Sequence, residues 1–402
     1  MASDCPEPDP CSPVPALVDQ TGEQLLPMFR IQDKRSTWRI TCKESVIEAV
    51  IDRAEAAACG RIERFCEIEL ELVTGDSGAL FRLARAIDAI TPARIGVLSK
   101  AERGYRLLGP VPEADHGAPV QLDPAMDPVS AFLAIVAQCL RHYRLNETIL
   151  LERPCPEAVH QARVALRRLR TAFVIFRPLL ACPGGDGSVT LQEELRKAAA
   201  LLGEARDHDV MLASIPPGPV ADRIGQARQL AYANMAEWLA SPECRRLFLD
   251  CVEWMATVGW REAEETAGLR SMALEDYASM ALDRLRRRIR KHGHHLGELP
   301  DDLRHQLRKD AKKLRYAHEF VGSLFEDAAP RKHRKFGKAL SRLQDALGAL
   351  NDLAMSAQRL GALGLPEPEE GRLISSPGLH DKLLKRAAHA RHDLLKITPY
   401  WR

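Results

Sequence analysis

The sequence lacks the long apolar runs and the closely spaced cysteines that mark two large classes of protein. No apolar run approaches the roughly 18 residues that a membrane-spanning helix requires, so an integral membrane protein is not expected. The ten cysteines show neither CxxC nor Cys/His spacing, which excludes the common zinc motifs and favours reduced thiols. Because no signal peptide is recognised, the sequence predicts a soluble, cytoplasmic protein.

Aromatic residues are also scarce, at 5% of the chain, and none lies on the basic helical stripes described next. Proteins that bind single-stranded nucleic acids usually stack the bases on such side chains. No stretch resembles a helix-turn-helix or another base-reading motif. Nucleic acid is therefore not an expected partner, although general binding of polyanions stays open as an alternative.

One stretch of the chain occurs twice, 145 positions apart, and both copies keep their basic residues. Residues 159–180 read VHQARVALRRLRTAFVIFRPLL and align with residues 304–325, which read RHQLRKDAKKLRYAHEFVGSLF. Steps of 3, 4 and 3 residues place a quartet of basic or histidine side chains on one helical face in each copy. The quartets are His160, Arg163, Arg167 and Arg170 in the first copy, and His305, Arg308, Lys312 and Arg315 in the second.

Like charges on one stripe repel one another, and a helix built only for stability would carry carboxylates among them. The two stripes therefore indicate a polyanionic ligand. For the histidines, the alternative is a structural role at the start of a helix, but their common phase in both copies favours binding. A bound phosphate would raise the pKa of a histidine, so tighter binding at mildly acidic pH is expected.

The offset of 145 extends beyond the basic stretch. Residues 128–143 align with 273–288, and residues 201–209 align with 346–354. Three segments in one register predict a duplicated multi-helix unit, with two bundles related by a pseudo-two-fold axis.

Two further matched pairs are expected to have structural roles. Gly203 and Gly348 suit close packing of helices, because they carry no side chain. Asp207 and Asp352 are placed to pair with basic residues of a neighbouring helix.

Proline and glycine divide the chain into segments. The first residues are rich in proline before any periodic pattern begins, and a second Pro/Gly-rich stretch follows about 80 residues later. We therefore expect a disordered N-terminus, a small α+β segment, a linker and a helical domain at residues 1–27, 28–108, 109–126 and 127–402, the last with halves at about 127–262 and 272–402.

The α+β segment contains a strand of strict alternation, CEIELELVTGD at residues 66–76. It places Glu67, Glu69 and Glu71 on one face. Three carboxylates on one face suit a hard divalent cation such as Mg²⁺. The alternative is a half-buried strand with a hydrated acidic face.

The region 127–402 resembles the CHAD family of conserved-histidine α-helical domains. The resemblance is carried by VHQARVALRRLR, LGEARDHD, LRHQLRKDAKKLRYAHEF, LQDALGALND and the terminal PYW. It implies a mainly α fold of two four-helix bundles, and non-catalytic binding of inorganic polyphosphate through a basic groove between them. Association with polyphosphate granules would follow. Carried over by position, the binding residues would be His160, Arg163, Arg167, Arg170, Lys197, His305, Arg308, Lys312, Arg315 and Arg342.

The segment from EIELELVTGD to SKAERGYRLL resembles the second half of a CYTH domain, the triphosphate-tunnel fold. A complete domain opens with an E-x-E-x-K strand that has no counterpart in residues 1–27. A half-barrel cannot close its tunnel, so triphosphatase activity is not expected and no cofactor is required. Mg²⁺ would matter only if this segment were functional. A vestigial or structural set would comprise Glu67, Glu69, Glu71, Lys100 and Arg103.

The alternatives to polyphosphate binding are therefore a metal-dependent triphosphatase and generic binding of polyanions or nucleic acid.

Overall fold

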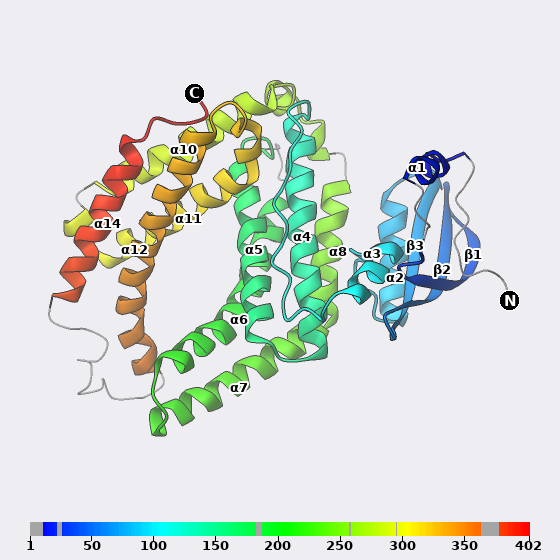
Figure 1. Ribbon diagram of the computed structural model, residues 1–402, viewed down its shortest axis with the longest axis horizontal. Helices are drawn as coiled ribbons and strands as arrows, with labels where there is room; N and C mark the ends of the chain where they lie inside the picture. The colour runs from blue at the N-terminus through cyan, green and yellow to red at the C-terminus, as the bar shows by residue number, and fades with distance from the viewer. Residues whose placement is uncertain (1–10, 22–25, 182–186, 257–258, 295, 363–377) are drawn as a thin grey trace. The chain divides into compact units, whose positions relative to one another are not determined.

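The computed structural model describes residues 11–21, 26–181, 187–256, 259–294, 296–362 and 378–402. The chain forms two compact units, Met1–Glu113 and Ala114–Arg402 (Figure 1). The first contains a small sheet and the second is helical, which confirms the mainly α fold class with a small α+β segment. Among the described residues, no helix combines the length and the apolar character needed to cross a membrane.

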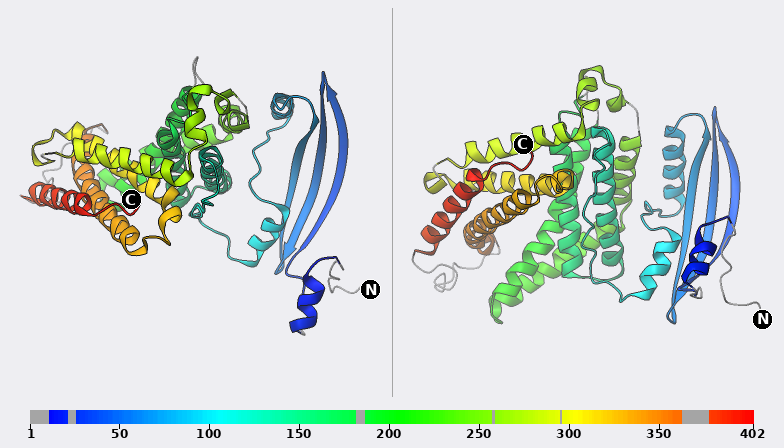
Figure 2. Two further views of the ribbon diagram at one scale, coloured as in Figure 1. Left: turned by 90° about the horizontal axis from the view of Figure 1, so that it is seen from above. Right: turned by 45° about the horizontal axis from the view of Figure 1, so that its top comes forward.

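The N-terminal unit is built on an antiparallel sheet of order β1-β2-β3. The turn between β2 and β3 consists of Cys59 and Gly60, whose φ angles of 51° and 73° fit the two-residue turns of tight hairpins. Helices α2 and α3 lie on the same side of the sheet (Figure 2). The elements are α1 (Val14–Thr21), β1 (Arg30–Cys42), β2 (Ser45–Ala58), β3 (Arg61–Thr74), α2 (Gly78–Ile90) and α3 (Lys100–Leu108).

Helix α3 begins with a capping box, in which Ser99 and Glu102 bond to each other's backbone N–H groups. It packs Leu107 against the small buried residues Ala56 and Ala58 of β2. The expected strand at 66–76 is the second part of β3. The disorder expected for residues 1–27 does not hold for Val14–Thr21, which is helical, and much of the remainder lies outside the described residues.

The helical unit repeats a series of long helices. Successive helices of each copy pack on one another, α4 on α5, α5 on α6 and α6 on α7, then α10 on α11, α11 on α12 and α12 on α14. Helices α5 and α11 are separated by the predicted offset of 145 at both ends. The helices are α4 (Pro128–Glu152), α5 (Pro156–Phe176), α6 (Ser188–Ser214), α7 (Pro219–Ala240), α8 (Pro242–Ala256), α9 (Ala267–Arg270), α10 (Leu274–His292), α11 (Asp301–Val321), α12 (Pro330–Ala362) and α14 (Leu379–Lys396).

One continuous hydrophobic core runs through both copies. The rings of Phe176 on α5 and Tyr277 on α10 stack with their centroids 5.2 Å apart. The guanidinium group of Arg284 donates to the carbonyl oxygens of Val174 and Ile175 at 3.1 and 2.6 Å. These contacts hold α5 against the second copy.

The expected linker at 109–126 is in large part packed on the helical unit. Ala114, Val120 and Leu122 are buried in the shared core. The carbonyl oxygen of Asp115 lies 2.9 Å from both His142 Nε2 and Asn146 Nδ2. Pro and Gly content predicted a linker here, but it could not show that the few apolar residues of this stretch pack against the helical unit.

Candidate functional site

Helices α5 and α11 present the two basic quartets as the periodicity predicts. On α5, Ala162, Leu166 and Leu169 are buried in the core. On α11, the equivalent Leu307 and Ala311 are fully buried. The quartet residues lie beside these core faces and are half-buried on both helices: His160, Arg163, Arg167 and Arg170, and His305, Arg308, Lys312 and Arg315.

The two stripes meet near their centres, because α5 and α11 contact each other. Arg167 Nε donates to the hydroxyl oxygen of Tyr316 at 3.4 Å, which joins the first stripe to the second helix. Burial lowers the pKa of Lys312 from 10.5 to about 7, and the neighbouring arginines add to this effect. The arginines are Arg308 and Arg315 from its own copy, and Arg163 and Arg167 from the other.

In each stripe, an aspartate of the following helix pairs with the arginine at the second position of the quartet. Arg163 on α5 pairs with Asp207 on α6 at 3.0 Å. In the second copy, Arg308 on α11 lies 3.7 Å from Asp352 on α12. Both ion pairs confirm the structural role predicted for the aspartates.

The two matched glycines differ. A Cβ atom at Gly203 would touch the guanidinium group of Arg163 at 3.6 Å, and the carbonyl oxygen of Gly203 accepts a hydrogen bond of 3.4 Å from the same group. A Cβ atom at Gly348 would meet nothing within 4 Å. A side chain at Gly203 would therefore make only ordinary van der Waals contact with Arg163, and Gly348 has open space beside it, so the prediction of close packing is wrong at Gly348.

The two histidines of the quartets have different partners. Burial lowers the pKa of His160, and the positive charge of Arg206 lowers it further. His305 Nδ1 lies 2.8 Å from the side-chain oxygen of Asn351, which occupies the position equivalent to Arg206. Each histidine is the fifth residue of its helix, so neither caps a helix start. The sequence alone did not identify Arg206 and Asn351, although the offset of 145 could have paired them.

The ends of the stripes near Arg170 and Arg315 also carry positive charge. Burial and the neighbouring Arg196 lower the pKa of Arg170. Arg315 lies 3.5 Å from Glu319 and 5.0 Å from the ring centre of Tyr316. Tyr316, which also contacts Arg167, was not a predicted site residue.

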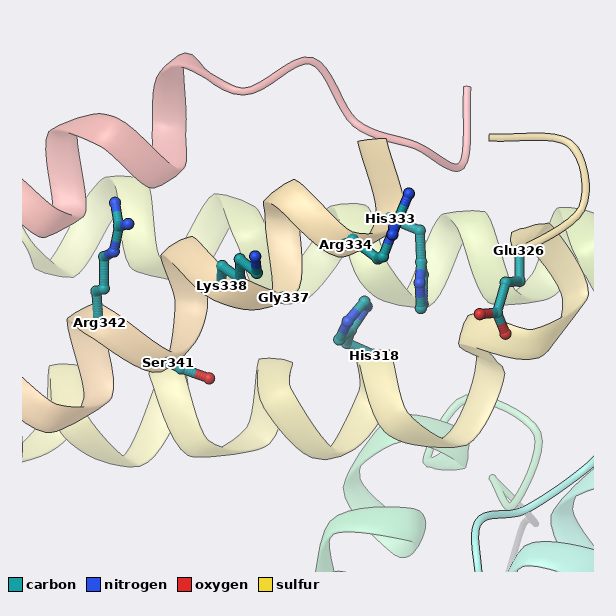
Figure 3. Close-up of a pocket in the computed structure, with 8 residues that line it drawn as sticks. All are labelled: His318, Glu326, His333, Arg334, Gly337, Lys338, Ser341 and Arg342. Carbon is teal, nitrogen blue, oxygen red and sulfur yellow. The ribbon is translucent and has the colours of Figure 1, made fainter. Parts of the chain in front are cut away.

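Lys197 and Arg342 are not placed among the facing residues. Lys197 is exposed and pairs with Glu194 of its own helix at 2.7 Å, which raises the pKa of the lysine. Arg342 is exposed on α12 and borders a pocket between α11 and α12 (Figure 3).

In the N-terminal unit, the acidic face of β3 is covered by cations of α3 and β1. Glu67 lies 3.2 Å from Arg103 and 3.6 Å from Lys100, and Glu69 lies 3.3 Å from Lys100. Lys100 also contacts the buried carboxylate of Asp52 at 2.7 Å. In the part of the chain that the structure describes, no three His, Cys, Asp or Glu side chains are grouped to hold a metal ion.

Asp52 is the centre of this network. Its side chain is 0% exposed, and Arg35 and Lys100 both contact it at 2.7 Å. The hydrogen bond from Arg35 is the main reason that the pKa of Asp52 falls to about 2. Glu71 pairs in register with Glu48 on β2, outside the network. The expected set of Glu67, Glu69 and Glu71 is thus not assembled as a metal site, and Glu67 and Glu69 instead join β3 to α3.

A comparison with protein families matches residues 134–361 to the CHAD domain model, which is more than half of the chain. The chain belongs to the CHAD domain family. The crystal structure of the CHAD domain from the plant Ricinus communis is similar, with 27% sequence identity and a TM-score of 0.57. The match covers 71% of this chain and 97% of the plant domain.

The CHAD match spans both copies and includes all ten of the predicted binding residues. The N-terminal unit lies outside the matched residues. Its resemblance to a CYTH half-domain therefore stays a prediction from sequence.

Proposed function

We propose that the helical unit binds inorganic polyphosphate, without catalysis, along the stripes of α5 and α11. The observation that carries the proposal is the position of Lys312, which is largely buried between the two helices and whose pKa is lowered by that burial and by two arginines from each copy. Concentrated like charge of this kind is unfavourable in the empty protein, and a polyanion between the two helices relieves it. Membership of the CHAD family supports the same ligand class.

The chemistry of polyphosphate fits the residues available. The ligand is a linear chain with about one negative charge per phosphate and no bases to recognise, so binding depends on many donors along a track. Guanidinium groups offer forked donors that match phosphate oxygens, and a lysine adds a mobile point charge. The quartets supply both kinds of donor along two adjoining helices.

Arg163 and Arg308 are the residues best suited to test the proposal, because each occupies the same place in its copy. Each has an aspartate partner on the following helix, and both arginines lie close enough to Lys312 to lower its pKa. A phosphate chain that reaches both arginines would pass Lys312. Such binding would dock the protein on polyphosphate granules without consuming the ligand.

The test is a salt titration of binding to long-chain polyphosphate, with duplex DNA at equal phosphate concentration as competitor. Wild type and Arg163→Ala/Arg308→Ala are compared, and far-ultraviolet circular dichroism checks that the variant keeps its helices. The variant should bind about tenfold more weakly or worse, since each charged hydrogen bond contributes about 1.5–3 kcal/mol. The plot of log affinity against log salt concentration should also become less steep, by about 1.5 in its slope, because two phosphate contacts are lost.

The matched control is Lys385→Ala/Arg386→Ala, which removes two exposed charges from α14. If the control weakens polyphosphate binding as much as the test variant does, or if DNA competes equally well, the stripes are a general surface for polyanions. No binding by wild type would overturn the proposal. Release of phosphate from tripolyphosphate with Mg²⁺ would instead favour a triphosphatase in the N-terminal unit.

A further inference from the structure

A pocket of 490 Å³ lies between α11 and α12 (Figure 3). Most of its lining comes from α12, with one residue from α11 and one from the segment after it. The lining residues are His318, Glu326, His333, Arg334, Gly337, Lys338, Ser341 and Arg342. Apart from Arg342, none of them belongs to the predicted polyphosphate site.

One wall of the pocket is cationic. Arg334, Lys338 and Arg342 follow one another at intervals of four residues, which places them along one side of α12. All three are exposed, and no carboxylate of the described residues lies within ion-pair distance of them. The carboxylate among the lining residues, Glu326, lies at the opposite end of the pocket from Arg342 (Figure 3). The charge of the pocket therefore favours an anion.

The floor contains two histidines that pack on each other, His318 from α11 and His333 from α12. Their ring centroids are 4.3 Å apart. Each ring lies on a glycine of the opposite element, because a Cβ atom at Gly337 would come within 2.8 Å of His318 Nε2, and one at Gly322 within 2.5 Å of His333 Nε2. The two glycines are what allow the histidines to meet beneath the cations.

The hydroxyl group of Tyr400 is the hydrogen-bond partner of His318 Nδ1. It lies 2.8 Å from His318 Nδ1, and when it donates, the ring proton of neutral His318 resides on Nε2. That nitrogen faces Gly337 in the lining of the pocket. Burial and the neighbouring His333 lower the pKa of His318 to about 4, so the ring is uncharged at neutral pH, and in the tautomer that a donating Tyr400 hydroxyl selects, its Nε2–H group is a donor.

His333 has no hydrogen-bond partner for either ring nitrogen within the described residues, and both nitrogens are buried. The groups facing it are His318, Tyr400, Glu326 and, from its own helix, Arg334. Burial lowers the pKa of His333, against the opposing effect of Glu326. Because both nitrogens are buried, an anion in the pocket would act on this ring through its charge, by favouring the protonated imidazole.

The pocket also lies on a suitable side of α12. Arg334 precedes Asp352 by 18 residues, which is five turns of a helix at 3.6 residues per turn. The two residues therefore share one face of α12, and Asp352 is the residue that holds Arg308 of the second stripe. A ligand running along α11 can reach both.

We propose that this pocket binds a phosphate group, held by Arg334 and Lys338 with the Nε2–H group of His318 as a further donor. The inference rests on the proposed function for its ligand class, and it adds a second contact on α12 for the same chain. Because an anion in the pocket favours protonated imidazole, occupancy is coupled to uptake of a proton by the histidine pair.

The test follows the imidazole signals of His318 and His333 by NMR in the full chain. The signals are assigned from their loss in His318→Gln and His333→Gln, and the probe is tripolyphosphate. In wild type, tripolyphosphate should raise the pKa of at least one of the two histidines. In Arg334→Ala/Lys338→Ala, the Kd read from these signals should increase about tenfold or more. The matched control, Lys332→Ala/Lys335→Ala, removes two exposed charges of α12 that do not line the pocket and should behave as wild type.

Titration curves that tripolyphosphate leaves unchanged in wild type would overturn the inference, as would an equal response in the pocket variant. A response to orthophosphate as well would support it and show that one free phosphate suffices, whereas a response to tripolyphosphate alone would identify the chain as the ligand. Failure of the proposed function is separable: long-chain polyphosphate would then not bind, while the histidine response to tripolyphosphate persists. If long-chain polyphosphate binds but tripolyphosphate leaves the histidine signals unchanged, the phosphate site in the pocket is refuted and the proposed function is not.

Discussion

Replacement of Lys312 by methionine should stabilise the protein and weaken polyphosphate binding at the same time. Burial, together with the positive charge of the four arginines, lowers the pKa of Lys312 from 10.5 to about 7 in the folded state. At 1.36 kcal/mol for each pKa unit, keeping this lysine charged costs on the order of 5 kcal/mol of folding free energy. Methionine has a similar length and no charge, so Lys312→Met removes that cost.

The sign of the pH dependence follows from the same pKa. The unfolded chain binds the lysine proton more tightly than the folded protein, so stability rises with pH where the two states differ. The cost of Lys312 is fully present below pH 7 and disappears as the pH rises from about 7 to about 10.5. Lys312→Met should therefore gain most stability at pH 6 and progressively less at pH 8 and 9.

The assay is urea unfolding followed by circular dichroism at pH 6, 7, 8 and 9, combined with polyphosphate binding at each pH. Lys309→Met is the matched control, because Lys309 is exposed on the same helix and does not belong to the stripe. A variant no more stable than wild type at pH 6 would refute the argument from charge. A variant that is more stable and binds polyphosphate with unchanged affinity would refute the role of Lys312 in binding.

Three further predictions concern other parts of the molecule. Polyphosphate binding at pH 8 should take up close to one proton through Lys312, measured by calorimetry in buffers of different ionisation enthalpy, and Lys312→Met should lose this uptake. Asp52→Asn should destabilise the N-terminal unit by about 2 kcal/mol, since Arg35 and Lys100 lose a charged acceptor. Because the pKa of Asp52 is lowered to about 2, its contribution is present above about pH 4 and is lost as the pH falls through 2, so the difference between Asp52→Asn and wild type in urea unfolding should be small at pH 2 and absent at about pH 1. Gly337→Ala should cost about 1–3 kcal/mol in thermal unfolding, because its Cβ atom would come within 2.8 Å of His318, whereas Gly348→Ala, with open space at the same helix, should not.

Local pattern and internal repetition predicted the features that depend on one helix or on the offset between copies. Helical phase placed each quartet beside a core face, and the offset paired Asp207 with Asp352 before any contact was known. His318 follows the buried Leu314 by four residues, so helical phase also accounts for its half-buried position against His333 and Tyr400.

Features that depend on how two helices are rotated about each other could not be predicted. The sequence does not show that Tyr316 meets Arg167 across the copies, nor that His318 and His333 face each other over two glycines. The prediction for Lys197 did not take account of Glu194, three residues earlier on the same helix, with which the lysine forms an ion pair. The acidic face of β3 suggested a metal because Lys100 and Arg103, its partners in space, lie about 30 to 40 residues away in the sequence.

The two copies differ at the centre of the site, and the difference determines how many positive charges the empty protein holds there. Position 167 in the first copy is arginine, and the equivalent position 312 is lysine. Arginine stays protonated at any physiological pH, whereas a lysine in the same surroundings can release its proton. With arginine at both positions, the empty site would keep every charge. With lysine at one of them, about half of the molecules at pH 7 can lose a charge where repulsion is greatest, and an incoming polyphosphate restores it.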